Sequence, residues 1–157
     1  MSVSSRMGLG FGATSGIITT LGLITGLTLG TGSKVAVISG IITIAVADAL
    51  SDAFGMHVSQ ESANKYSDKA VWKATVTTFV SKFLFAMSFL LPELLFDLKK
   101  AMYVGYVWGL SLIAVFAYVI AKRQNKNPWT SALEHSVTAI LVTGASYITG
   151  IIIRSIL

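Results

Sequence analysis

Residues 9–29 read LGFGATSGIITTLGLITGLTL, a run of 21 positions without a charged side chain. A helix needs about 20 mostly apolar residues to cross the hydrocarbon core of a bilayer. Four further runs of this kind follow, so the chain contains five predicted spans at 9–29, 35–57, 71–91, 102–121 and 131–153. Transmembrane strands would be about half as long and would alternate in polarity, which these runs do not. The sequence therefore predicts an all-α integral membrane protein, with residues 1–157 forming a single transmembrane domain in the lipid bilayer.

The composition excludes several other classes of protein. Of the 157 residues, 54% are hydrophobic and only 12% are charged, whereas a typical soluble domain has about 25% charged residues. This composition argues against both a soluble globule and a disordered chain. Cysteine is absent, so disulfides and thiolate chemistry are excluded. The net charge of +5 comes from single basic residues between apolar runs, which is typical of membrane-flanking loops and not of a nucleic-acid surface.

The basic residues predict an orientation, because Lys and Arg flanking the spans favour the cytoplasmic side. With five spans, seven basic residues fall on the side of the N-terminus and four on the other. The first set is Arg6, Lys65, Lys69, Lys73, Lys122, Arg123 and Lys126, and the second is Lys34, Lys99, Lys100 and Arg154. We therefore expect a cytoplasmic N-terminus.

The connections between spans carry turn and cap residues. Residues 30–33 (GTGS) predict a tight hairpin between the first two helices. Pro92 is expected to end the third helix, and residues 94–100 then to lie along the membrane interface. Thr130 is expected to cap the fifth helix beside an interfacial Trp129.

The first helix is rich in glycines spaced four residues apart, namely Gly12 and Gly16, then Gly22 and Gly26. This spacing stacks small residues on one helix face and lets another backbone approach closely. The neighbouring backbone can belong to the same chain or to a second copy. Five helices are few to enclose a polar pathway, and this favours a homodimer.

Ionisable side chains interrupt the apolar runs at a cost of roughly 2.5–3.5 kcal/mol each on insertion scales. Asp48 and Asp52 are four residues apart and therefore share a face of the second helix. With Glu134 of the fifth helix, and Met56 and His57 nearby, they form a candidate site for a divalent cation. Because carboxylates also titrate, the same groups could exchange a metal ion for protons.

Lys82, near the middle of the third predicted helix, leaves a second interpretation open. It could neutralise Asp48 in a structural ion pair, while Asp52 and Glu134 merely reach the interface. Catalytic signatures are missing: the sequence has no HExxH motif, no phosphate-binding loop and no serine elbow. We therefore do not expect an enzyme.

Two segments resemble a known family. Residues 10–20 (GFGATSGIITT) and 47–59 (ADALSDAFGMHVS) are similar to the first- and second-helix signatures of the vacuolar iron transporter family. The resemblance implies a homodimeric, proton-driven exporter of Fe²⁺ and Mn²⁺ in a prokaryotic cell membrane or a vacuole-type membrane. It also implies that Ser15, Asp48, Ser51 and Asp52 line the pathway. Lys82 either lines the pathway with them or packs against Asp48. The divalent ion is cargo, and no cofactor is expected.

The chain departs from that family at several positions. Ser15 stands where the family has an Asp, Asp52 where it has a Met, and Ile44 where many members have a Glu. The Glu-rich cytoplasmic metal-binding domain of longer members is replaced by residues 58–70. The alternatives are therefore a membrane scaffold without transport, held by an Asp–Lys pair, or a transporter of another cation.

Overall fold

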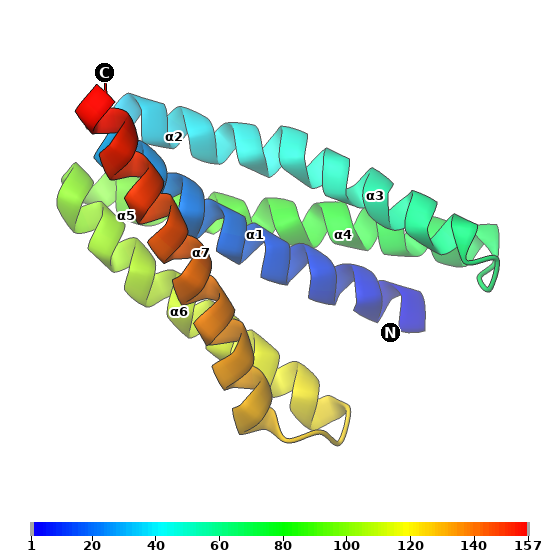
Figure 1. Cartoon of the computed structure of the whole chain (residues 1–157). Coiled ribbons are helices and arrows are strands. Elements are labelled where there is room, and N and C mark those ends of the chain that lie inside the picture. The colour runs from blue at the N-terminus through cyan, green and yellow to red at the C-terminus, as the bar shows by residue number, and fades with distance from the viewer. Residues whose placement is uncertain (1, 157) are drawn as a thin grey trace. The chain divides into compact units, whose positions relative to one another are not determined.

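The computed structural model describes residues 2–156, and all of its regular structure is helical. The elements are labelled in Figure 1 and follow one another as α1 (Val3–Thr31), α2 (Lys34–Thr43), the π-helical turn η1 (Ile44–Asp48), α3 (Ala49–Ser62), α4 (Asp68–Ser88), α5 (Leu90–Leu95), α6 (Leu98–Arg123) and α7 (Pro128–Ile156). Within the described residues there is no strand, in agreement with the all-α prediction.

Five helical segments are long and apolar enough to cross a membrane: Val3–Thr31, Lys34–Ser62, Asp68–Leu95, Leu98–Arg123 and Pro128–Ile156. They contain the five predicted spans, and every segment extends beyond the predicted range at both ends. The polar ends were harder to predict than the apolar centres, because a helix can continue past the hydrocarbon core into water. The second span continues to Ser62, through part of the polar connection at 58–70.

Two local predictions are wrong. Helix α4 already ends at Ser88, and Pro92 lies in the first turn of α5, where proline's missing N–H is tolerated. The cap of α7 is Asn127, whose Oδ1 accepts hydrogen bonds from the backbone N–H groups of Trp129 (3.0 Å) and Thr130 (3.4 Å). Asn127 outcompetes Thr130 because Pro128 is well suited to the first helical position.

The predicted hairpin between α1 and α2 is present. Gly32 adopts a φ of +63°, a left-handed conformation that glycine adopts without strain. Its backbone N–H donates to the Thr28 carbonyl at 3.1 Å, so the last turn of α1 is closed by a C-terminal cap.

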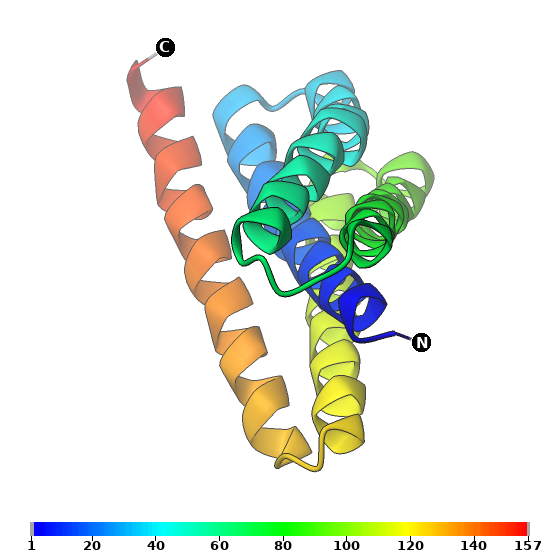
Figure 2. The same cartoon turned by 90° about the vertical axis from the view of Figure 1, so that its right-hand side faces the viewer.

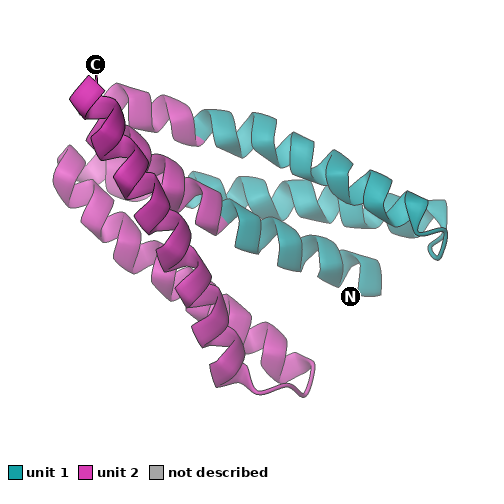
Figure 3. Ribbon diagram, viewed as in Figure 1, with its two compact units in different colours: residues 1–16, 42–88 teal, residues 17–41, 89–157 magenta. Residues whose placement is uncertain are grey.

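The chain divides into two compact units, drawn in two colours in Figure 3. Of the described residues, unit 1 contains 2–16 and 42–88, and unit 2 contains 17–41 and 89–156. Each unit therefore receives one half of α1.

Unit 1 is held together by small residues. Helices α3 and α4 lie side by side, as Figure 1 shows, and Ala49, Ala53 and Ala74 are buried. The N-terminal half of α1 packs on α4 so closely that a Cβ added at Gly12 would collide with Ser81 and the Thr78 carbonyl. Glycine at this position thus permits backbone contact within the chain.

In unit 2, helices α6 and α7 lie side by side, joined by the turn at 124–127 (Figure 2). The C-terminal half of α1 also uses its glycines here. A Cβ on Gly22 would lie 2.9 Å from Ser146 Oγ, and one on Gly26 would lie 3.7 Å from the Ser146 carbonyl oxygen. The glycines of α1 therefore meet other helices of the same chain in both units.

Candidate functional site

The polar centre of unit 1 is the ammonium group of Lys82, on α4. Its Nζ lies 2.5 Å from Asp48 Oδ2 and 2.5 Å from Asp52 Oδ2, and it donates to Ser15 Oγ at 3.0 Å. Ser15 Oγ in turn donates to Asp52 Oδ2 at 2.7 Å. The ammonium therefore donates hydrogen bonds to Ser15 and Asp52 and forms an ion pair with Asp48. We call these four side chains the Lys82 cluster.

The helix that carries the two carboxylates explains how they converge. Asp48 is the last residue of η1, and Asp52 lies in the first turn of α3. They are four positions apart, and both contact the same nitrogen, in agreement with a shared helix face. Single π-helical turns within α-helices are frequently found at functional sites, and this one contains the first residue of the carboxylate pair.

Exposure decreases from the carboxylates to the ammonium. The side chain of Asp48 is 38% exposed and that of Asp52 21%, whereas that of Lys82 is 1% exposed. With all three groups ionised, the cluster has a net charge of −1. A cation that approaches from the open side would therefore meet the two carboxylates before it meets Lys82.

The geometry of the two carboxylates suits one small cation. Their Oδ2 atoms are at most about 5 Å apart, because each lies 2.5 Å from the same nitrogen. Oxygen ligands bind Mg²⁺ or Ca²⁺ at about 2.0–2.6 Å. The ammonium therefore occupies the position that a metal ion shared by these two oxygens would take.

Met56 and His57 make other contacts in unit 1. The Met56 sulfur accepts a hydrogen bond from Gln60 Nε2 at 3.7 Å. His57 Nδ1 lies 3.0 Å from Thr75 Oγ1, and its ring packs edge-on against Trp72 with the centroids 4.6 Å apart. Met56 and His57 thus contact neighbouring side chains that are not members of the Lys82 cluster.

The remaining predicted site residues are more scattered. Ser51 is exposed. Glu134 belongs to unit 2, where it lines a surface pocket with His135 and Ser131. Across residues 2–156, no group of three or more His, Asp or Glu side chains is arranged to hold a metal ion. Of the predicted site residues, Asp48 and Asp52 are the two carboxylates that the structure brings together.

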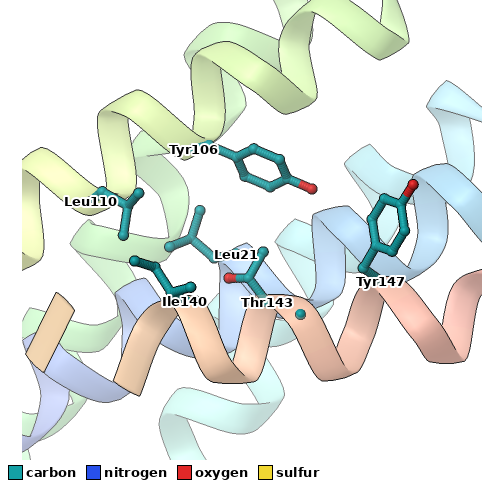
Figure 4. A pocket seen from close by; sticks show the side chains of 7 residues that line it. Leu21, Tyr106, Leu110, Ile140, Thr143 and Tyr147 are labelled. Atoms are coloured by element: carbon teal, nitrogen blue, oxygen red, sulfur yellow. The ribbon is translucent and has the colours of Figure 1, made fainter. Parts of the chain in front are cut away.

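Unit 2 contains an apolar pocket of about 290 Å³, shown in Figure 4. Leu21 from α1 lies between residues of α6 and α7, and the main polar atoms on its wall are hydroxyl groups. The Tyr106 hydroxyl accepts a hydrogen bond from Thr25 Oγ1 at 3.1 Å. Without a charged side chain on its wall, this pocket offers no site for a metal ion.

Sequence reasoning missed Glu93. Its side chain is fully buried in unit 2, and neither carboxylate oxygen has a hydrogen-bond partner within residues 2–156. The available signal was an acidic residue inside the apolar stretch at 89–96 (FLLPELLF), which is as costly in a membrane span as Asp48.

No family model and no curated protein sequence matches the chain. The likeness to vacuolar iron transporters therefore rests on the two motifs at 10–20 and 47–59. Both motifs contribute to the Lys82 cluster, through Ser15 and through the two carboxylates.

Proposed function

We propose that this protein is a membrane transporter of divalent metal cations of the Fe²⁺ and Mn²⁺ class. In this proposal two copies form a homodimer with cytoplasmic N-termini, and metal leaves the cytoplasm in exchange for protons. The cation binds between Asp48 and Asp52. The five apolar helices, the excess of basic residues on the N-terminal side and the family-like motifs support this reading.

The observation that carries the proposal is the convergence of two carboxylates on one cationic group. Lys82 acts as a tethered cation that holds the carboxylates together while no metal is bound. A metal ion would take its place, and the ammonium would withdraw from the two oxygens. The remaining negative charge of the cluster favours a divalent ion over a neutral solute.

Transport by purified protein in liposomes tests the proposal. Uptake of Mn²⁺ and of Fe²⁺ is measured with and without an imposed pH gradient. Loss of a residue that only supports a metal ligand typically costs about 10–100-fold in affinity or activity. We therefore expect Asp48→Asn and Asp52→Asn each to lower uptake at least tenfold.

Asp97→Asn provides the matched control, because Asp97 is an exposed carboxylate at the start of α6. It should leave the uptake of both metals unchanged. If the two cluster variants assemble normally and still transport metal like the wild type, the assignment of the site is wrong. If the wild type moves neither metal under either condition, the function itself is wrong.

A membrane scaffold is the second candidate, and one observation favours it. The Lys82 ammonium already makes two hydrogen bonds and a further ion pair within the chain, as expected of a cation with a purely structural role. Exchanging the charges of Asp48 and Lys82 in one double variant separates the two functions. A scaffold would keep its assembly with nothing else lost, whereas a transporter would keep its assembly and lose metal binding.

A further inference from the structure

Glu93 lies in α5, within unit 2, and its side chain is completely buried. Neither Oε1 nor Oε2 has a hydrogen-bond partner in the described part of the chain. An ionised carboxylate presents about four acceptor sites. Buried polar groups in folded proteins nearly always have partners, so an exception of this kind requires an explanation.

The cost of burial depends on the charge of the carboxyl group. An ionised carboxylate that is buried without a partner loses its strong hydration with nothing to replace it. A neutral carboxylic acid loses only the weaker hydration of an uncharged polar group. In the absence of hydrogen bonds, the neutral acid is therefore the cheaper species.

The charged groups around Glu93 do not compensate for this loss. Lys34 interacts with it electrostatically, but the ammonium donates its hydrogen bond to the Phe96 carbonyl at 2.9 Å. Within residues 2–156, the ion pairs closer than 4.0 Å are those of Lys82 alone. The other charges of this turn, on Asp97, Lys99 and Lys100, are exposed.

The rest of unit 2 adds no further cation from the helices before α5. Residues 17–33 and 35–41 contain no ionisable side chain. In α6, which packs on α5, the next titratable groups after Lys100 are the phenols of Tyr103 and Tyr106. Lys34 is thus the one ammonium placed to act on Glu93 from these helices, and its hydrogen bond goes to the Phe96 carbonyl and not to the Glu93 carboxyl group.

We infer that Glu93 is a proton-binding site, at which the carboxyl group is held as a neutral carboxylic acid in the folded protein at neutral pH. The ligand is a single proton on one of the two carboxyl oxygens. Ionisable residues inside membrane spans commonly serve as proton relays, and a neutral acid inside a span is a group that can carry a proton. This inference is independent of metal transport at the Lys82 cluster.

Infrared spectroscopy of the full chain in lipid vesicles tests the inference directly. A carboxylic acid absorbs through its C=O stretch, at a higher frequency than the stretches of a carboxylate. The spectrum of Glu93→Gln is subtracted from that of the wild type at neutral pH. We expect the difference to contain one carboxylic C=O band and no carboxylate band.

Asp97→Asn is the matched control, because it removes an exposed carboxylate four residues further along the chain. Its difference spectrum should contain carboxylate bands only. If the Glu93→Gln difference shows carboxylate bands as well, Glu93 is ionised and the inference is overturned.

A Lys34→Met variant adds an independent result. A neutral acid needs no counter-ion, so the carboxylic band should persist unchanged when Lys34 is removed. If the band instead appears only in Lys34→Met, Glu93 is ionised in the wild type with Lys34 as its counter-ion, and the inference fails.

Discussion

In unit 1, the buried ammonium of Lys82 donates to the Asp52 carboxylate and the Ser15 hydroxyl and pairs with Asp48, whereas in unit 2 the half-buried Lys34 donates to a backbone carbonyl. Glu93, the buried acid of unit 2, accepts no hydrogen bond from any described residue. Both regions thus place a lysine and an acid within apolar helices. The difference shows that burial inside the helices does not by itself decide whether an ionisable side chain has a hydrogen-bond partner.

The largest effect is expected from Lys82→Met. The substitution leaves two carboxylates close together without their cation, and removing one partner of a buried pair typically costs about 3–5 kcal/mol. We expect a loss of about 3 kcal/mol in the free energy of unfolding, since Asp48 keeps some exposure. Thermal unfolding in detergent measures it.

Adding Asp52→Asn to Lys82→Met sharpens this result. The double variant carries one carboxylate where the single variant carries two, so it should recover part of the lost stability. If Lys82→Met alone unfolds at the same temperature as the wild type, the charges of the Lys82 cluster do not stabilise unit 1.

A smaller effect is expected from Ser15→Ala. Ser15 accepts one proton of the Lys82 ammonium and donates to Asp52. Its loss leaves a buried charged donor unsatisfied, and hydrogen bonds to charged groups contribute about 1.5–3 kcal/mol. Because Ser15 is only half-buried, we expect its substitution to lower the free energy of unfolding by about 1.5 kcal/mol, at the lower end of that range. The same thermal unfolding experiment measures it. Ser5→Ala, at a half-buried hydroxyl near the start of α1 that bonds the neutral hydroxyl of the exposed Ser2, should have little effect.

The smallest effect is expected from Glu93→Gln. Glutamine copies the shape and neutrality of a carboxylic acid but adds one buried N–H donor, so we expect the free energy of unfolding to fall by about 1 kcal/mol, the lower end of the cost of an unsatisfied buried polar group. Asp52→Asn, which makes the same chemical change at a carboxylate with two donors, should cost more. If Glu93→Gln proves the more destabilising of the two, the contrast between the units is wrong.

Parts of the candidate site could be predicted from the sequence. The four-residue spacing of Asp48 and Asp52 predicts a common helix face, and both contact Lys82. A pair of Asp48 with Lys82 was one of two interpretations. The family resemblance placed Ser15 and Asp52 along one pathway, but their hydrogen bonds with Lys82 could not be predicted, because they depend on how α1, α3 and α4 pack.

Glu93 illustrates the opposite case. Its position in an apolar stretch was visible in the sequence. The burial of its carboxyl group without a partner could not be predicted, because it depends on how the helices of unit 2 pack. The π-helical turn at Ile44–Asp48 had no sequence signal either. It is a local change of hydrogen-bonding pattern inside a continuous apolar run.

By itself, the sequence determined that the chain forms five apolar helices long enough to cross a membrane, because length and hydropathy are local properties of a segment. It also determined which ionisable groups those helices contain. Only the tertiary structure decided which of them have partners. Asp52 lies 30 positions from Lys82 in the sequence, and Ser15 lies 67 positions from it. Lys34 donates to a carbonyl that lies 62 positions away. Such contacts depend on helix packing, since a side chain reaches only its spatial neighbours.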